Sequence, residues 1–221
     1  MRNFDELYNI TADRKGGETE LEKQLSKPKS STALAKIGDD RWLAEATKCI
    51  FQAGFNWKVV ESMWPGFEAA FSEFDLGKCA MLNEDDFDRL VNDTRIVRYG
   101  AKIKSVQENA LFMLELAKEG ESAGKVIANW SSTDYVGLLE MLKKRGSRLG
   151  GTTSQYFLRG MGKDSFILSQ DVIARLISEG VIDKAPTSKK AMQQVQVAFN
   201  EWMDQSGRSL TEISRVLAMS V

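Results

Sequence analysis

The chain has 221 residues, of which 43% are hydrophobic and 28% are charged, a composition typical of a globular protein with a sizeable core. It has no apolar run of about 18 residues and no secretory signal at its start, which argues against a membrane-spanning or secreted chain. The formal net charge is −1, so any nucleic-acid surface must come from local clusters of Lys and Arg. The chain has no His and two Cys, which excludes the usual Cys/His zinc sites.

Residues 1–38 form the first predicted segment, an N-terminal arm with short helices. We predict one short helix before the Gly16–Gly17 pair, a second over residues 18–25, and a polar connector around Pro28. The simplest interpretation is a mobile arm without chemistry.

Residues 39–221 are predicted to form the main helical domain, with its helices packed in two lobes. Asp39 has the position of an N-cap, and Gly54 that of the residue just after the end of the same helix. Further helices are predicted at residues 57–64, 66–75, 84–91, 103–117, 135–146, 154–161, 172–180, 188–207 and 209–219. About ten helices without any convincing alternation of period two predict an all-α fold.

The glycine pair Gly150–Gly151 separates a basic helix end, MLKKRGSRL, from a second run of helical spacing, SQYFLRGM. This pattern predicts a helix-hairpin-helix motif at about residues 138–160. Glycine permits a positive φ, and the amides of Thr152 and Thr153 would then lie at a helix N-terminus. Unpaired N–H groups and the helix dipole favour a phosphate at such a place.

Two stretches resemble the helix-hairpin-helix DNA glycosylase superfamily independently of each other. The run YFLRGMGKDSFILSQDVIARL (156–176) looks like the corresponding run of 3-methyladenine DNA glycosylase II, in which an aspartate follows the hairpin. The runs FQAGFNWKVVESMWPGFEAAFSEFD (51–75) and DFDRLVNDTRIVRYGAKIKSVQENA (86–110), followed by LKKRG and GTT, resemble 3-methyladenine DNA glycosylase I in the same order. The resemblance covers roughly residues 40–176 and implies a helical DNA glycosylase.

The resemblance places the catalytic aspartate on Asp171. Cleavage of the N-glycosidic bond develops an oxocarbenium-like sugar, and a fixed carboxylate can stabilise that cation and orient the attacking water. Position alone allows another interpretation, an acid that stabilises a helix N-terminus. Thr152 occupies the hairpin position where bifunctional superfamily members carry a lysine nucleophile, so the resemblance implies a monofunctional enzyme. Lys163, in the neighbouring loop, is the rival amine.

Aromatic residues supply candidate walls for a flipped base, and an electron-rich ring face suits a cationic methylated purine. The resemblance to the QAGxxW motif puts the stacking tryptophan on Trp57. The family's base-reading glutamate falls on Cys49, and Glu45, one turn earlier, can reach in from the same face. The other candidate pocket residues are Phe51, Trp42, Tyr156 and Phe55. At least half of the aromatic candidates are expected in core packing instead.

Basic residues cluster beside two predicted turns, where contact with phosphates would position a duplex without reading its sequence. The candidate DNA contacts are Arg98, Lys102, Arg145 and Arg148, and the first two match basic positions of the family's IVR…K segment. The alternative is solvated charge at helix ends.

We therefore expect a monofunctional DNA glycosylase that excises alkylated purines of the 3-methyladenine type in base excision repair. It should act on double-stranded DNA with damaged bases, as a monomer, without a cofactor or metal, in the bacterial cytoplasm at the nucleoid. The resemblance implies a structural zinc held by two Cys and two His, which this sequence cannot form. The open alternatives are a broader-specificity alkylbase glycosylase, a non-catalytic helix-hairpin-helix DNA-binding protein and a helical protein-interaction module.

Overall fold

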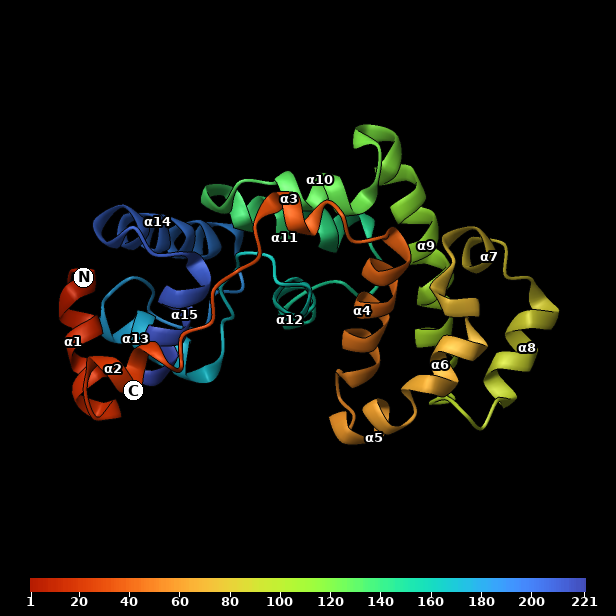
Figure 1. The fold of residues 1–221 in the computed structure, drawn as a ribbon, viewed down its shortest axis with the longest axis horizontal. Coiled ribbons are helices and arrows are strands. Elements are labelled where there is room, and N and C mark those ends of the chain that lie inside the picture. Colours follow the sequence, from red (N-terminus) through yellow and green to blue (C-terminus); the bar gives the residue numbers. More distant parts are fainter. The chain divides into compact units, whose positions relative to one another are not determined.

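The computed structural model describes residues 1–221 and consists of helices and connecting turns (Figure 1). Its α-helices are α1 (Phe4–Lys15), α2 (Glu18–Glu22), α3 (Ser31–Leu34), α4 (Asp39–Gln52), α5 (Trp57–Ser62), α6 (Trp64–Ala70), α7 (Leu76–Ala80), α8 (Glu84–Asn92), α9 (Gly100–Gly120), α10 (Ala123–Asn129), α11 (Tyr135–Arg145), α12 (Thr152–Met161), α13 (Gln170–Ser178), α14 (Lys189–Ser206) and α15 (Leu210–Met219). Two 3-10 helices, η1 (Ser72–Phe74) and η2 (Ser132–Asp134), complete the fold. The all-α prediction is confirmed. The expected number of about ten helices was too low, because helices as short as α3 and α7 show no periodic pattern.

The chain divides into two compact units, and each is built from separate stretches of sequence. The first unit comprises Met1–Lys29, Ser131–Gly137 and Gly162–Val221, and the second comprises Ser30–Trp130 and Leu138–Met161. The N-terminal stretch therefore changes unit after Lys29, whereas the sequence suggested a boundary at residue 38.

In the first unit, α1 packs against α15, which also packs against α13 and α14. Asn3 caps α1 by accepting a hydrogen bond from the Glu6 N–H (2.9 Å), and Gly16 ends the helix with a φ of 87°. The apolar face of α1 is buried, with Phe4 1% and Leu7 0% exposed. Residues 4–22 are thus a packed part of this unit, in contrast to the mobile arm that the sequence suggested.

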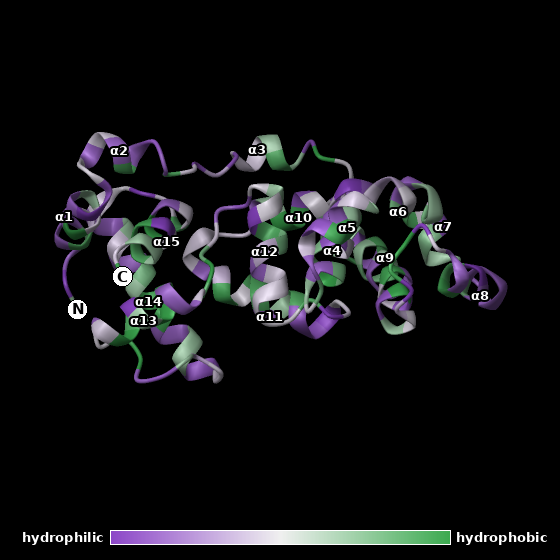
Figure 2. Ribbon diagram, turned by 90° about the horizontal axis from the view of Figure 1, so that it is seen from below, coloured by the Kyte–Doolittle hydropathy of each residue, from purple (hydrophilic) through white to green (hydrophobic).

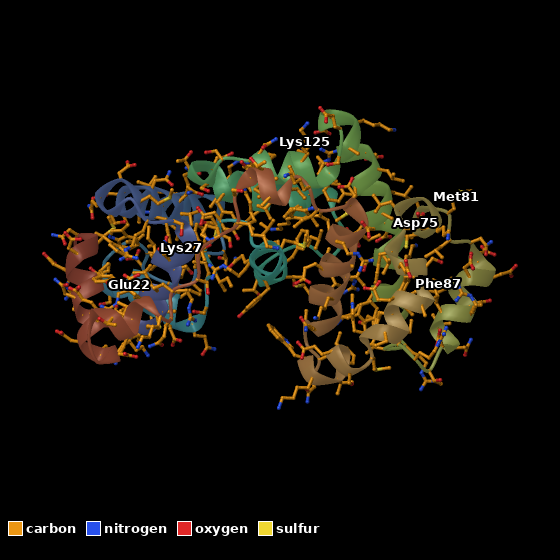
Figure 3. The ribbon with its side chains drawn as sticks, viewed as in Figure 1. Glu22, Lys27, Asp75, Met81, Phe87 and Lys125 are labelled. Atoms are coloured by element: carbon orange, nitrogen blue, oxygen red, sulfur yellow. The ribbon has the colours of Figure 1, made fainter.

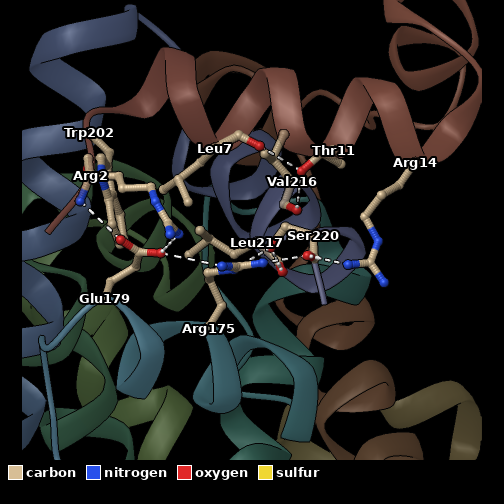
Figure 4. A network of polar contacts seen from close by, with 10 residues as sticks. All are labelled: Arg2, Leu7, Thr11, Arg14, Arg175, Glu179, Trp202, Val216, Leu217 and Ser220. Atoms are coloured by element: carbon tan, nitrogen blue, oxygen red, sulfur yellow. Dashed lines mark hydrogen bonds and ion pairs between the residues drawn. The ribbon is translucent and has the colours of Figure 1, made fainter.

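A polar network joins α1 to the last turns of α13 and α15 (Figure 4). The Glu179 carboxylate, just after α13, accepts from the guanidinium of Arg2 (2.8 Å) and from that of Arg175 (3.3 Å). Arg175 also donates through Nε to the Ser220 hydroxyl (2.8 Å) and through Nη2 to the Ser220 carbonyl. That carbonyl accepts from the Arg14 guanidinium as well (3.0 Å). Because each buried charge meets an opposite charge or a carbonyl, the network stabilises the packing of these helices.

The second unit is arranged around α4, which packs against α9 and α12 (Figure 1). Asp39, expected to cap α4, lies instead in its first turn, after the N-cap Gly38. Its carboxylate accepts hydrogen bonds from the Ala123 and Gly124 N–H groups (2.9 and 2.8 Å), so Asp39 binds the N-terminus of α10. At the other end of α4 the expected turn is confirmed, because Gly54 follows the C-cap Ala53 with a φ of 75°.

One predicted helix of the second unit breaks earlier than its apolar spacing suggests. The pattern of residues 66–75 predicted a continuous helix, but α6 ends at Ala70 and Ser72 to Phe74 have φ values of 54°, 57° and 61°. Arg41 binds both the Glu68 carboxylate and the Glu73 carbonyl, which holds this left-handed turn in place. Tertiary contacts thus override a local helical pattern that L residues would otherwise follow.

Asp75 then starts α7 by accepting from the Lys78 N–H (2.8 Å), and Figure 3 labels both Asp75 and the exposed Met81 that follows α7. The acidic first turn of α8 is hydrophilic in Figure 2, as expected for negative side chains at a helix N-terminus. None of the helices has both the length and the apolar composition needed to cross a bilayer.

Candidate active site

The hairpin predicted at residues 138–160 is present in the second unit. The helix α11 ends at Arg145 and α12 begins at Thr152, and Gly151 between them has a φ of 59°. Thr152 is exposed and Thr153 half-buried in the first turn of α12. The first amides of an α-helix have no partner four residues earlier, so this turn is a place where an anion can bind.

A buried asparagine fixes the approach to the hairpin. Asn109, on α9 and 0% exposed, accepts from the Ser147 N–H (2.8 Å) and donates to the Ser147 carbonyl (3.0 Å). Gly146 lies so close to Leu149 Cδ1 and the Leu142 carbonyl that an added Cβ would come within 2.8 Å of either. Sequence reasoning missed Asn109, although an amide within an apolar helical face is the kind of residue that needs a fixed partner.

Asp171 lies in the first turn of α13, in the first unit, and is exposed. Ser169 caps the helix by accepting from the Val172 N–H (3.3 Å). Val172 and Leu176 are buried on the inner face, which leaves the Asp171 carboxylate on the outward face of a well-anchored helix. Its backbone position is thus fixed by packing, while its side chain stays accessible.

An aromatic pair marks the surface of the second unit near the hairpin. Trp57, the first residue of α5, is 48% exposed, and Tyr156, on α12, is 36% exposed. Their ring centroids lie 5.3 Å apart at an interplanar angle of 90°. Tyr156 is one helical turn beyond Thr152, so α12 carries both the hairpin amides and one ring of this pair.

Two other aromatic candidates belong to the core of the second unit. Trp42 packs edge-on against Phe157 (5.9 Å between centroids) and Phe51 against Phe67 (4.7 Å), and Trp42 and Phe51 are both 0% exposed. The Trp42 indole N–H has no hydrogen-bond partner and lies directly against Gly124. The sequence suggested pocket walls at these positions, and the structure gives them a packing role because large rings dominate core energetics.

Glu45 and Cys49 lie one turn apart on α4, and Glu45 lies against Gly160 of α12. The Cys49 thiol lies 3.8 Å from the Glu45 carboxylate, and burial together with that carboxylate raises the pKa of Cys49 to about 12. The half-buried Glu45 fills the space beside Gly160, where an added Cβ would overlap its Oε1 atom. A protonated thiol therefore stands where the family glutamate was expected, with a carboxylate one turn away.

The four basic candidates differ in their surroundings. Arg98 is exposed, and Arg145 forms an ion pair with Glu119 (2.7 Å). Arg148 donates to the Ala101 carbonyl (3.2 Å) and lies over the Tyr99 ring. Lys102, in contrast to the expected DNA contact, is only 6% exposed, and its ammonium is bound to backbone carbonyls.

The lysine amine and the thiols that could act as nucleophiles are buried. Lys163 is 5% exposed, and burial lowers its pKa although Asp164 opposes the shift. Cys79 is buried like Cys49, and both are free thiols. The structure has no cluster of three or more His, Cys, Asp or Glu side chains that could hold a metal ion.

The fold matches solved helical DNA glycosylases. A crystal structure of 3-methyladenine DNA glycosylase I superposes with a TM-score of 0.52 and 26% identity, over 62% of this chain and 82% of that one. An 8-oxoguanine glycosylase/lyase of Methanocaldococcus jannaschii, solved in complex with DNA, aligns over 96% of this chain and 94% of its own with a TM-score of 0.53. Its 15% identity makes this a likeness of fold alone. The all-α architecture with its helix-hairpin-helix is thus that of a DNA glycosylase.

The sequence comparisons narrow this class to a family. Residues 38–138 match the methyladenine glycosylase family. DNA-3-methyladenine glycosylase 1 of Escherichia coli (strain K12) is 30% identical over 132 residues, which cover 50% of this chain and 70% of that protein. The DNA-3-methyladenine glycosylase of Haemophilus influenzae is 28% identical over the same length. The chain belongs to the DNA-3-methyladenine glycosylase family.

Proposed function

We propose that this chain excises 3-methyladenine and similar alkylated purines from double-stranded DNA by hydrolysing the N-glycosidic bond. The observation that carries the proposal is the exposed Trp57–Tyr156 pair one turn from the hairpin, in a chain of this family. An edge-to-face pair of this kind offers one open ring face, on which a flipped, positively charged base can stack. The hairpin amides on the same helix would hold a phosphate nearby.

The chemical step is assigned to Asp171. Its exposed carboxylate is the group that would stabilise the positive charge on the sugar as the base departs and orient a water molecule. Arg98, Arg145 and Arg148 would contact phosphates and fix the register on the duplex without reading sequence. The substrate would place the enzyme at the bacterial nucleoid, where it would act as a monomer.

Base selection is assigned to Glu45. A carboxylate accepts hydrogen bonds from the N–H edge of a purine, and the Glu45 carboxylate lies 3.8 Å from the Cys49 thiol on α4. Cys49 itself stays protonated at neutral pH and offers a weak donor in place of the carboxylate expected there.

The test is release of 3-methyladenine from methylated duplex DNA under single-turnover conditions. We expect release by the wild-type chain and a loss of at least about tenfold for Trp57→Ala, in line with the cost of losing a stacking ring. Met81→Ala, which truncates an apolar side chain that is 81% exposed in the same unit, should leave release unchanged. No release by the folded wild-type protein would overturn the proposal.

The enzyme should also leave the abasic strand intact. Thr152 has no amine, and the Lys163 ammonium is buried, so neither provides an accessible nucleophile for a Schiff base. Borohydride added during turnover should trap no covalent complex with DNA. A trapped complex that disappears in Lys163→Met would show lyase chemistry instead.

A broader specificity for alkylated bases is the second candidate, and Cys49 is the observation that favours it. Without a carboxylate at that position, the site discriminates less strongly against bases that lack the 3-methyladenine donor pattern. Release of 7-methylguanine at a rate comparable with that of 3-methyladenine would support this alternative.

A further inference from the structure

Lys102 caps the C-terminus of the central helix of the second unit. The residue lies near the start of α9 with 6% of its surface exposed. Its ammonium donates to the Phe51 carbonyl (3.2 Å) and to the Ala53 carbonyl (2.7 Å), at the last turn and the C-cap of α4. Carbonyls at a helix C-terminus lack intrahelical partners and carry the negative end of the dipole, so a cation is favoured there.

Aromatic rings enclose the same ammonium. Its distances to the ring centroids are 4.6 Å for Phe55, 5.6 Å for Tyr99 and 5.9 Å for Phe51. Phe55 and Tyr99 meet edge to face at 6.4 Å, and both are more than 40% exposed. Burial lowers the pKa of Lys102, and the nearby Arg148 guanidinium lowers it further. The carbonyls and ring faces offset that cost.

The segment that follows the cap leads directly to Trp57. Gly54 turns the chain with a positive φ, and the Phe55 N–H donates to the Gln52 carbonyl (3.0 Å). Asn56 then accepts from the Lys58 N–H (3.0 Å) and starts α5, of which Trp57 is the first residue. Three residues, Gly54 to Asn56, separate the Ala53 carbonyl that accepts from Lys102 from the first residue of α5.

The hairpin approaches the same point. The Arg148 Nε donates to the Ala101 carbonyl (3.2 Å), and its guanidinium lies 5.8 Å from the Tyr99 ring centroid. The stretch Tyr99–Lys102 therefore contacts both the turn before Trp57 and the segment before Gly150–Gly151. The turn before Trp57 and the hairpin are both proposed to contact DNA, and both are thus held by this stretch.

We propose that Lys102 is a positioning residue that fixes the Phe55–Trp57 turn relative to the hairpin and makes no contact with DNA phosphate. The inference rests on the proposed function of Trp57 as the base-stacking residue. Displacing a recognition group by about an ångström can cost up to about a hundredfold in rate, because reactive geometry is narrow. Removing Lys102 should therefore lower the rate of base release and leave the electrostatic part of DNA binding unchanged.

The experiment uses Lys102→Met, which keeps the stem and removes the ammonium. Arg98→Met serves as the phosphate-contact standard, and Lys118→Met, an exposed lysine at the far end of α9, as the matched control. For each variant, binding to a duplex with a tetrahydrofuran abasic analogue is measured against salt concentration, together with single-turnover release of 3-methyladenine. Arg98→Met should reduce the slope of log K against log salt by about one.

Lys102→Met should keep the wild-type salt slope while its release rate falls by about tenfold to a hundredfold. Lys118→Met should match the wild type in both. A loss of slope equal to that of Arg98→Met would make Lys102 a phosphate contact and overturn the inference, as would a wild-type rate in folded Lys102→Met. If that variant does not fold, Lys102→Gln, which removes the charge but keeps a donor for the carbonyls, should retain both the wild-type slope and part of the rate. A reduced slope in Lys102→Gln would be contrary to the inference.

Hydrogen exchange provides a readout that does not depend on activity. In Lys102→Met the amides of residues 53–57 should exchange faster, while those of the Asn109–Ser147 contact stay protected. Hydrogen exchange tests the positioning role of Lys102 even if the wild-type chain releases no base. In that case only the proposed function fails. Unchanged exchange across residues 53–57 would refute the positioning role.

Discussion

The Gly160 backbone leaves the space that the Glu45 carboxylate occupies. Gly160→Ala should destabilise the protein by no more than the lower end of the about 1–3 kcal/mol typical of overpacking, because the new methyl group overlaps Glu45 Oε1, the far end of a flexible side chain. In a Glu45→Ala background that overlap disappears, and the same change should become stabilising by up to about 1 kcal/mol through helix propensity. Urea unfolding of the four proteins of this cycle measures both values. The same sign in both backgrounds would show that the Glu45 carboxylate moves away from residue 160 at little cost in free energy.

The Asp171 carboxylate is exposed to solvent, and the helix that carries it is capped by Ser169. Asp171→Asn keeps the shape and removes the charge, and electrostatic stabilisation of this kind is worth about 10² to 10³ in rate. Because 3-methyladenine is a good leaving group, the loss should lie toward the lower end of that range. Binding to the abasic-analogue duplex should change little, since hairpin amides and basic side chains supply it. An unchanged rate of base release by folded Asp171→Asn would move the chemistry elsewhere, with Glu45 the next carboxylate to test.

The helix α13 carries Asp171, and its position depends on contacts made at its other end. The Glu179 side chain at the end of this helix is 2% exposed and is shared by Arg175, at 10%, and Arg2, at 47%. Glu179→Ala should cost about 3–5 kcal/mol in the free energy of unfolding, because it leaves the buried Arg175 without its counter-charge. Arg2→Ala should cost no more than about 1 kcal/mol, since its guanidinium is half in solvent. Urea denaturation measures the free energy of unfolding of both variants. Equal losses in the two would contradict the difference in burial between Arg175 and Arg2.

The helix pattern also shows what one sequence can reveal. The end of α4, the hairpin and the first turn of α13 follow from glycines and spacing, which are local signals. The end of α6 does not, because it depends on Arg41 reaching the Glu73 carbonyl across 32 residues. The sequence predicted an exposed charge at Lys102, because the carbonyls that its ammonium binds lie 49 and 51 residues away. Long-range hydrogen bonds leave no periodic trace in the sequence, so these roles appear only in the structure.

Across both units, three groups with raised pKa values couple stability to alkaline pH. Burial raises the pKa of Cys49 and Cys79 from 9.0 to about 12, and burial with the Glu22 contact raises that of Tyr8 from 10.0 to about 12. Between these values the folded state holds protons that the unfolded state has lost, so stability is full below about pH 9 and falls as pH rises toward 12. Urea midpoints between about pH 8 and about pH 11 should show this decline. A Cys49→Ala/Cys79→Ala protein should have a shallower decline, and an equally steep one would exclude the thiols as its cause.

The division of the first unit among three stretches of sequence has a consequence for how the protein is made. Its stretch Met1–Lys29 leaves the ribosome well before α14 and α15, against which α1 packs and which are encoded in the last third of the sequence. At typical elongation rates, α1 waits roughly 10 to 40 seconds for α15. The second unit, whose last residue is Met161, can complete its own core during that interval. During that interval the apolar side chains of α1 are open to chaperones, and the helix that carries Asp171 is secured only after α15 has emerged.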